Sequence, residues 1–212
     1  MMSDEPFGMD DASETDPLAP IAFESPGRFA IHNPEPSHPE RAALEQAPFR
    51  LGESASAHPL ASAAELRPHA LALVRQARRS ICISSADMEP WLYDEAAMQQ
   101  ACTAFLLQHG DCRLRLLVRD PALAIRRGHR LLSLARRLTS RMEIRRAHPD
   151  HPGGEDAFLL ADRSGLLWRP DPREFQGRAC YHEPGRVRQF QARFDEAWNL
   201  AIHDPDLRSL LL

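Results

Sequence analysis

The sequence predicts an α/β domain in which a mixed, largely parallel sheet is flanked by helices. Two observations carry this prediction. Short apolar segments with the period of a strand alternate along the chain with longer segments that have the period of a helix, which is the pattern of parallel strands joined by crossover helices. Near the C-terminus, two strand-like segments are separated only by a short polar turn, which predicts a hairpin and makes the sheet mixed.

The first predicted helix and strand lie between residues 62 and 85. Ser62 and Glu65 have the spacing of a capping box, and apolar residues follow at helical intervals up to Ala77. Because a proline disfavours a helix interior, Pro68 shifts the expected start of the regular helix to about its own position. A short apolar strand follows at 80–85.

The middle of the chain supplies two more helices and a strand. A helix is expected from about Asp94 to Gly110, and leucine then alternates with arginine over 113–118 with the period of a strand. Asp120 followed by Pro121 is typical of a helix start, so a helix is predicted to run to about Thr139. Its polar face carries arginines at spacings of four and seven: Arg126, Arg130 and Arg137.

The last part of the domain contains a third strand, the hairpin and a long helix. The third strand is marked by Met142 and Ile144, and a loop rich in proline and glycine follows at 149–154. The hairpin pairs 157–162 with 166–169. The final helix is predicted from a core stripe that recurs at helical spacing: Val187, Phe190, Phe194, Ala197, Trp198 and Ala201.

Charge divides the chain into two parts. Residues 1–46 hold many acids, prolines and serines but few apolar residues, so we expect a disordered acidic tail, with order beginning near Phe49 and a domain over 47–212. Residues 1–70 carry twelve acids and four arginines, whereas 113–146 carry eleven arginines and two acids. The acidic tail and the basic domain are therefore expected to attract each other.

All 26 basic residues are arginines, which excludes every mechanism that needs a lysine. Schiff-base chemistry and a Walker lysine are among them, and no cofactor motif is present. The four cysteines form no C-x-x-C pair, and the chain has no long apolar run and no signal-like start. We therefore expect reduced, buried cysteines, no membrane span and a cytoplasmic location.

The order of elements, with the hairpin and the final Phe194-to-Trp198 helix, resembles one repeat of the phospholipase D superfamily. That family's motif is a histidine, any residue, a lysine, four residues and an aspartate. In the matching segment Asp162 takes the place of the aspartate, but Glu155 stands at the histidine and Ala157 at the lysine. The resemblance therefore implies a single-repeat scaffold that has lost the nucleophile and the phosphate-binding lysine. It leaves a homodimer open, although a second copy would not restore either residue.

The sequence is also similar to a lysine-poor group of bacterial domains of unknown function that are phospholipase D-like and are sometimes joined to GNAT-type acetyltransferases. This similarity rests on four segments, and it implies a fold without an assigned activity. The segments are 118–121, 126–132, 181–184 and 194–198.

Strand ends of the predicted sheet suggest a site for an anion. Ligands of open α/β sheets bind beyond the carboxyl ends of the strands. Arg119 and Asp120 end one predicted strand. Asp162 ends another, and Arg169 follows a third, so we expect these residues to gather around one crevice. A phosphate or carboxylate is the ligand that such a set holds best. The predicted ligand-binding residues are Arg119, Asp120, Arg127, His129, Arg169, Arg178 and His182.

Other interpretations remain open at this stage. The aspartates Asp120 and Asp162 can instead pair with these arginines as structural bridges. A hydrolase or transferase would use His129 or His182 as its acid or base, with Asp162 orienting the imidazole. A third alternative is an interaction module that binds protein, or binds nucleic acid through the arginines of the 121–139 helix. His148, Asp150 and His151 are expected to form an ordinary loop, not a metal site.

Overall fold

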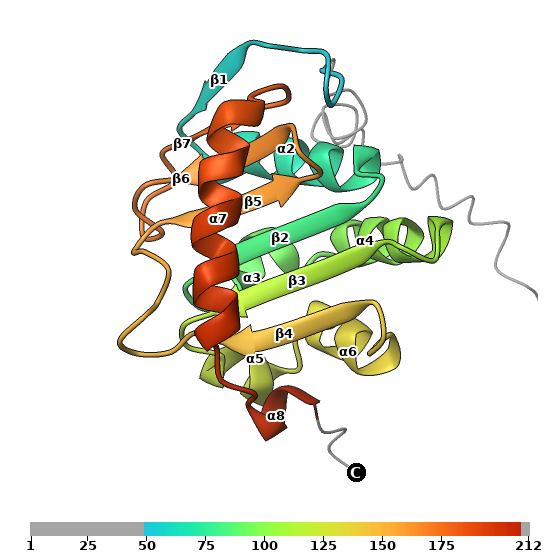
Figure 1. The fold of residues 1–212 in the computed structure, drawn as a ribbon, viewed down its shortest axis with the longest axis vertical. Helices are drawn as coiled ribbons and strands as arrows, with labels where there is room; N and C mark the ends of the chain where they lie inside the picture. The colour runs from blue at the N-terminus through green and yellow to red at the C-terminus, as the bar shows by residue number, and fades with distance from the viewer. Residues whose placement is uncertain (1–48, 209–212) are drawn as a thin grey trace, which may run out of the picture. The chain divides into compact units, whose positions relative to one another are not determined.

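The computed structural model describes residues 49–208 (Figure 1). The predicted tail over 1–46 lies outside the described residues. The strands are β1 (Ala57–Leu60), β2 (Ser80–Ser85), β3 (Arg113–Val118), β4 (Met142–Arg146), β5 (Ala157–Ala161), β6 (Gly165–Arg169) and β7 (Gly177–Cys180). The helices are α2 (Ala63–Gln76), α3 (Pro90–Tyr93), α4 (Ala96–Gln108), α5 (Ala122–Arg127), α6 (Arg130–Arg137), α7 (Pro184–Leu200) and α8 (Pro205–Arg208).

The strands form one sheet in the order β1-β7-β6-β5-β2-β3-β4. The mixed α/β class is confirmed, but the expectation of a largely parallel sheet was wrong. Only β2 with β3 and β3 with β4 pair in parallel, whereas the other four pairs are antiparallel. The physical reason lies in the connections. The parallel strands are joined through helices, whereas the short turn between β5 and β6 reverses the chain and β5 pairs antiparallel with β2.

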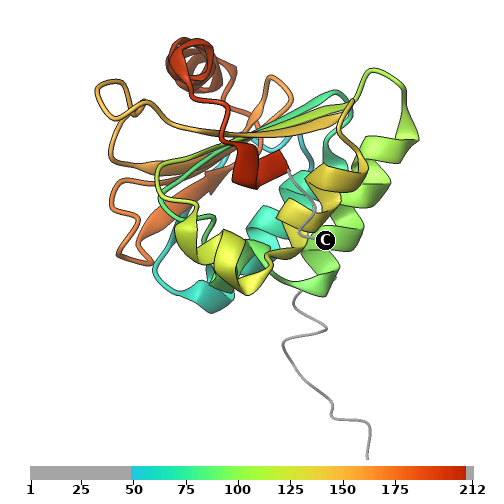
Figure 2. The same ribbon diagram turned by 90° about the horizontal axis from the view of Figure 1, so that it is seen from below.

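Helices cover the two faces of the sheet unequally. Helices α2, α4, α5 and α6 lie on one face, and α7 lies alone on the other, as the perpendicular view shows (Figure 2). Each face has its own apolar cluster, because alternate residues of a strand point to opposite sides. In β2, Ile81 and Ile83 belong to the cluster under α2 and α4, and Cys82 belongs to the cluster under α7.

Helix α2 begins where the capping residues predict. The backbone N–H of Glu65 donates to Ser62 Oγ at 3.3 Å, and the Glu65 carboxylate accepts the N–H of Ala61 at 2.7 Å. The expected delay of the regular helix to Pro68 was wrong, because α2 runs from Ala63 straight through this proline. A proline at this position leaves the carbonyl of Ala64 without its helical partner, and Ala64 is exposed, so water can hydrate that carbonyl.

The helix predicted from residue 121 to 139 is two helices. Gly128 adopts a left-handed conformation with φ of 75° and ends α5, and α6 then begins after His129. Glycine adopts this conformation without a steric penalty, so it ends a helix readily. The three arginines at spacings of four and seven therefore do not form one continuous helical face.

The core stripe of the final helix is confirmed. Val187, Phe194, Ala197 and Trp198 are buried against the sheet, and Phe190 packs at the margin of the same cluster. Two short strands, β1 and β7, were not predicted. Both contain residues that are poor strand formers, such as Pro59 and Gly177, and β1 is stabilised by pairing along β7.

All four cysteines are buried, and none of them forms a disulfide, as expected. Burial raises the pKa of the Cys102 thiol to about 12 and that of the Cys180 thiol to about 11. None of the helices over residues 49–208 is long and apolar enough to cross a bilayer.

Candidate anion-binding site

The ends of the strands form two opposite borders of the sheet. We call the border at the carboxyl end of β2 the carboxyl edge and the border at the amino end of β2 the amino edge. The predicted site residues are divided between these two edges. Val118 of β3 lies opposite Ser85 at the carboxyl end of β2, so Arg119 belongs to that edge. Asp162 lies beside Ser80 at the amino end of β2, because β5 runs antiparallel to it. The six residues of β2 span five intervals of about 3.3 Å, so the two edges are roughly 17 Å apart. The predicted single crevice is therefore not formed.

At the carboxyl edge the guanidinium of Arg119 is already occupied. Its Nη1 donates to the carbonyl oxygens of Gly154 at 2.9 Å and Asp156 at 3.3 Å, and its Nη2 donates to that of Glu155 at 3.0 Å. Arg119 thus ties the end of β3 to the loop that leads into β5. This loop contains Glu155 and is followed by the buried Ala157 at the start of β5.

Arg169, also at the carboxyl edge, is buried in a second closed network. It is 2% exposed and forms an ion pair with Glu89, which is 3% exposed. Its Nη1 also donates to the carbonyl oxygens of Pro172 at 3.2 Å and Glu174 at 2.9 Å, and its guanidinium lies over the ring of Trp91. Arg169 therefore anchors the loop after β6 and has no donor directed at a free cleft.

Glu89 is a buried carboxyl group with a strongly raised pKa, and the sequence did not identify it. Burial raises its pKa to about 7, and the neighbouring Arg169 opposes that shift. Met88 and Glu89 both have left-handed backbones, with φ of 68° and 40°, which is uncommon for residues other than glycine. The only sequence signal for this position was a single carboxylate within the mostly apolar segment 88–93.

His129 is buried, and both of its ring nitrogens are engaged. Nδ1 accepts the backbone N–H of Leu131 at 3.1 Å, so the proton lies on Nε2, which donates to the carbonyl of Met88 at 3.2 Å. Burial lowers the pKa of His129, although Asp94 opposes the shift. This neutral histidine begins α6 and links it to the end of β2. His182 is exposed. Within residues 49–208 no hydrogen bond joins either histidine to Asp162 or Asp120.

Asp162 holds the backbone at the amino edge. Its carboxylate accepts the N–H groups of Arg78 at 2.9 Å, Arg79 at 2.8 Å and Ser80 at 3.0 Å. Asp162 itself is left-handed, with φ of 53°, at the turn between β5 and β6. These contacts fix the start of β2 against that turn, so the carboxylate has little capacity left to orient a catalytic histidine.

The remaining predicted residues are also separated. Asp120 accepts the N–H of Ala122, the first residue of α5, at 3.0 Å, although the N-cap position of this helix is Pro121. Arg178 donates from Nη2 to both carboxylate oxygens of Glu183, at 3.1 and 3.2 Å. Arg127 is exposed at the end of α5 and has no described side-chain partner among residues 49–208.

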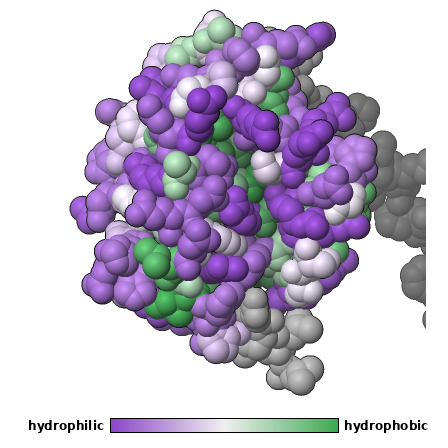
Figure 3. Space-filling view, viewed as in Figure 1, coloured by the Kyte–Doolittle hydropathy of each residue, from purple (hydrophilic) through white to green (hydrophobic). Residues whose placement is uncertain are grey.

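A cleft of about 610 Å³ lies between α7 and the amino end of β2, on the side where α7 covers the sheet. Apolar side chains show through between hydrophilic ones on this face (Figure 3). The cleft is lined by β2, β3, the turn after β5 and α7, and its arginines are Arg115, Arg163 and Arg188. The sequence reasoning did not single out these three residues, because they lie on a strand, a turn and a helix that are far apart in sequence.

The arginines of this cleft differ in how they are engaged. Arg115 pairs with Asp195, with Nη2 and Oδ1 2.8 Å apart, and also donates to the sulfur of Cys82 at 3.4 Å. Arg163 and Arg188 are exposed and have no side-chain partner within the described residues. The acids of the lining are Asp162 and Asp195, and both accept other donors. The groups left free at the cleft are thus guanidinium donors.

Gln191 and Cys82 contribute to the inner wall of this region. Gln191 donates to Asp195 Oδ1 at 3.0 Å and lies 3.6 Å from the Cys82 sulfur. Burial raises the pKa of the Cys82 thiol, and Arg115 opposes this shift. A buried, protonated thiol is a weak nucleophile, so the wall acts as a surface for packing.

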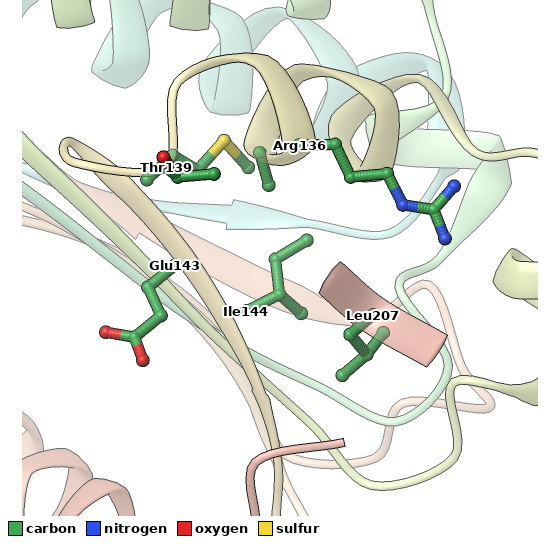
Figure 4. A pocket seen from close by; sticks show the side chains of 7 residues that line it. Arg136, Thr139, Glu143, Ile144 and Leu207 are labelled. Carbon is green, nitrogen blue, oxygen red and sulfur yellow. The ribbon is translucent and has the colours of Figure 1, made fainter. Parts of the chain in front are cut away.

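A second cavity, of about 270 Å³, lies between α6, β4 and α8 (Figure 4). Ala135, Met142, Ile144 and Leu207 make its walls apolar. The Glu143 carboxylate points away from it, and Arg136 extends toward α8, where Nη2 donates to the carbonyl of Asp206 at 2.6 Å. The cation in its lining, Arg136, is thus tied to the backbone of α8.

No group of three or more histidine, cysteine, aspartate or glutamate side chains within residues 49–208 is arranged to hold a metal ion. His148 and His151 face each other in the loop before β5, with ring centroids 5.7 Å apart. His148 Nδ1 accepts the N–H of Asp150 at 3.2 Å, which accounts for the turn.

Comparison with known proteins places the fold. A family model described as a domain of unknown function, DUF7931, matches residues 62–210. A comparison with curated protein sequences gives no match.

Two solved structures are similar in fold. One is a phospholipase D family member, Nuc from Salmonella typhimurium, with a TM-score of 0.52 and 14% identity over 73% of this chain and 99% of that chain. The other is TrmBL2, described as an archaeal chromatin protein with a novel mode of DNA binding. Its TM-score is 0.51, with 11% identity over 68% of this chain. This chain spans about half of TrmBL2, 52% of its length. These identities establish the phospholipase D-like fold alone.

Proposed function

Because the chain belongs to the family described as a domain of unknown function, DUF7931, and has a phospholipase D-like fold, we propose that it is a non-catalytic member of this fold that binds an anionic group through arginines. The ligand carries a phosphate or a carboxylate. Its site is the cleft between α7 and the amino end of β2, not the carboxyl edge at which the sequence predicted it.

The single observation that carries the proposal is the pair Arg163 and Arg188. Both line the 610 Å³ cleft, both are exposed, and neither has a carboxylate partner among the described residues. Guanidinium groups bind phosphate or carboxylate through two parallel hydrogen bonds, and their charge does not depend on pH in the physiological range. Arg115, held by Asp195, adds a third positive charge at the same cleft.

Loss of catalysis follows from the motif positions. A phospholipase D-like reaction needs a histidine nucleophile and a phosphate-binding lysine, whereas this chain has Glu155 and Ala157 there. Arg119 holds the backbone of the same loop through three carbonyl groups. The alternative hydrolase or transferase gains no support from His129, whose two nitrogens are both used, or from His182, which has no described carboxylate partner.

The test is a thermal-shift titration of the full chain with inorganic phosphate, pyrophosphate and citrate, each matched in ionic strength with sodium chloride. A ligand at 100 times its Kd stabilises the folded state by about 2.7 kcal/mol, which raises Tm by roughly 5–10 °C for a domain of this size. The double variant Arg163→Gln with Arg188→Gln should lose that shift. Its matched control, Arg126→Gln with Arg127→Gln, removes the same charge from α5 and should keep it.

Two results would overturn the proposal. One is the lack of any Tm shift beyond that of sodium chloride for all three anions. The other is an equal loss of the shift in both double variants, because the effect would then arise from net charge and not from the cleft.

A further inference from the structure

Arginines without partners continue beyond the cleft along the amino edge of the sheet. We define the arginine edge as Arg78, Arg79, Arg163 and Arg188. All four are exposed, and none of their guanidinium groups has a hydrogen bond or ion pair to another described residue. Arg126, Arg127 and Arg137 are also exposed without a described side-chain partner, but the arginine edge gathers four such groups around one turn and one cleft.

The fold brings the arginine edge together from three separate segments. Asp162 accepts the backbone N–H groups of both Arg78 and Arg79, which places these residues beside the turn that carries Arg163. Arg188 of α7 lines the same cleft as Arg163. Arg113 adjoins the edge, because its N–H donates to the carbonyl of Arg79 at 3.1 Å. The acid at the centre, Asp162, accepts three backbone N–H groups and so competes weakly for the guanidinium groups.

Several adjacent guanidinium groups match a ligand with repeated negative charges better than a single small anion. The described surface around the arginine edge lacks the exposed apolar side chains that insert into a membrane and the aromatic rings that stack on single-stranded bases. Of the described large apolar side chains that are exposed, Phe175, Leu200 and Ile202 follow strands or helices that end at the carboxyl edge. Leu107, at the end of α4, is the one near the arginine edge. A single leucine is too little for insertion into a bilayer, and the exposed aromatic side chain, Phe175, lies at the other end of the strands, where it cannot stack on bases held at the arginine edge.

We propose that the arginine edge binds the sugar-phosphate backbone of duplex nucleic acid, without reading the base sequence. Duplex phosphates are spaced regularly and are strongly attracted to clustered cations, and their contacts give affinity that is independent of sequence. This inference does not depend on a small ligand in the cleft, because Arg78 and Arg79 lie outside the cleft lining.

The experiment is fluorescence anisotropy of a labelled 20-base-pair duplex DNA with the full chain, from 50 to 200 mM salt. Four phosphate contacts predict a slope of log K against log salt of about −3.6, and hence a roughly 100-fold loss of affinity over this range. The double variant Arg78→Gln with Arg79→Gln should reduce the slope by about 1.8 and weaken binding at least about tenfold at 50 mM salt. The control Arg146→Gln with Arg173→Gln, which removes the same charge from exposed positions at the carboxyl edge, should bind as the unaltered chain does.

The outcomes separate this inference from others. No binding of the duplex at 50 mM salt overturns it, and so does an equal effect of the two double variants. Binding of phosphatidylserine vesicles that depends on Arg78 and Arg79, with no binding of DNA, would assign the arginine edge to a membrane surface instead. If the unaltered chain shows no Tm shift with phosphate but does bind DNA, the proposed ligand of the cleft is refuted and the inference about the arginine edge stands.

Discussion

Replacing Asp162 should reveal a structural role by a loss of stability. The carboxylate accepts three backbone N–H groups at 2.8–3.0 Å, and it fixes the start of β2 to the turn after β5. Hydrogen bonds to a charged group are worth about 1.5–3 kcal/mol each, but water can replace part of this at an edge where Arg78 and Arg79 are exposed. We therefore expect Asp162→Ala to lower the free energy of unfolding by about 2–4 kcal/mol.

Two further substitutions at Asp162 separate the causes. Asp162→Asn keeps one oxygen acceptor but turns an amide donor toward the other N–H groups, so a loss of about 1–2 kcal/mol is expected. Because φ is 53° at this position, Asp162→Gly should be less destabilising than Asp162→Ala, by about 1 kcal/mol, although it removes the same carboxylate. Thermal unfolding followed by circular dichroism measures these changes, with about 2–4 °C of Tm for each kcal/mol in a domain of this size.

The reasoning about Asp162 would be refuted by an Asp162→Ala variant whose Tm lies within about 2 °C of the unaltered chain, since that change corresponds to less than about 1 kcal/mol. The three N–H groups would then be satisfied equally well by water, and the aspartate would not hold the edge of the sheet.

Three other predictions concern separate parts of the fold. Because burial raises the folded-state pKa of Glu89 from 4.5 to about 7, this group destabilises the fold as pH rises from about 5 to 7. Glu89→Gln should remove that trend, worth up to about 3 kcal/mol in urea unfolding, and an unchanged pH dependence would contradict the assignment. Arg193→Lys should lose about 1–2 kcal/mol in the same assay, because the compact ammonium group of lysine cannot both reach Asp156 and replace the planar stacking of the guanidinium on two phenylalanine rings. An unchanged free energy of unfolding would argue against it. Gly177→Ala should cost about 1–3 kcal/mol, because its Cβ would lie 2.7 Å from a backbone oxygen of β6, whereas Gly185→Ala meets nothing within 4 Å and should be tolerated.

Several arginines in this fold make contacts that a lysine could not make. Arg119 contacts three carbonyl groups, and Arg169 contacts a carboxylate, two carbonyl groups and the face of Trp91. A planar guanidinium with five donors makes such divergent contacts, whereas an ammonium group is a compact point charge. Several arginines are thus part of the packing of loops and of α7, and others remain free at the amino edge.

Repetitive patterns in the sequence were sufficient to predict most elements. The apolar stripe from Val187 to Trp198 marks α7, and the alternation of leucine and arginine marks β3, because burial on one side of an element repeats with its period. Single positions were less informative. Gly128 lies within the single helix predicted to run to about Thr139, yet its left-handed backbone divides that helix in two. Strands β1 and β7 were missed, because pairing between strands determined them more than local propensity did.

The sequence alone determined the α/β class, the order of the main helices and strands, and the absence of lysine, so that the permanently charged basic side chains are all guanidinium groups. These follow from local periodicity and from residue identity. Only the tertiary structure decided which arginines are free. The antiparallel course of β5 carries Asp162 and Arg163 to the amino edge, and buried networks occupy Arg119 and Arg169 at the carboxyl edge. A free charge depends on which groups lie within hydrogen-bond distance, and that depends on strand direction and packing between segments far apart in the chain.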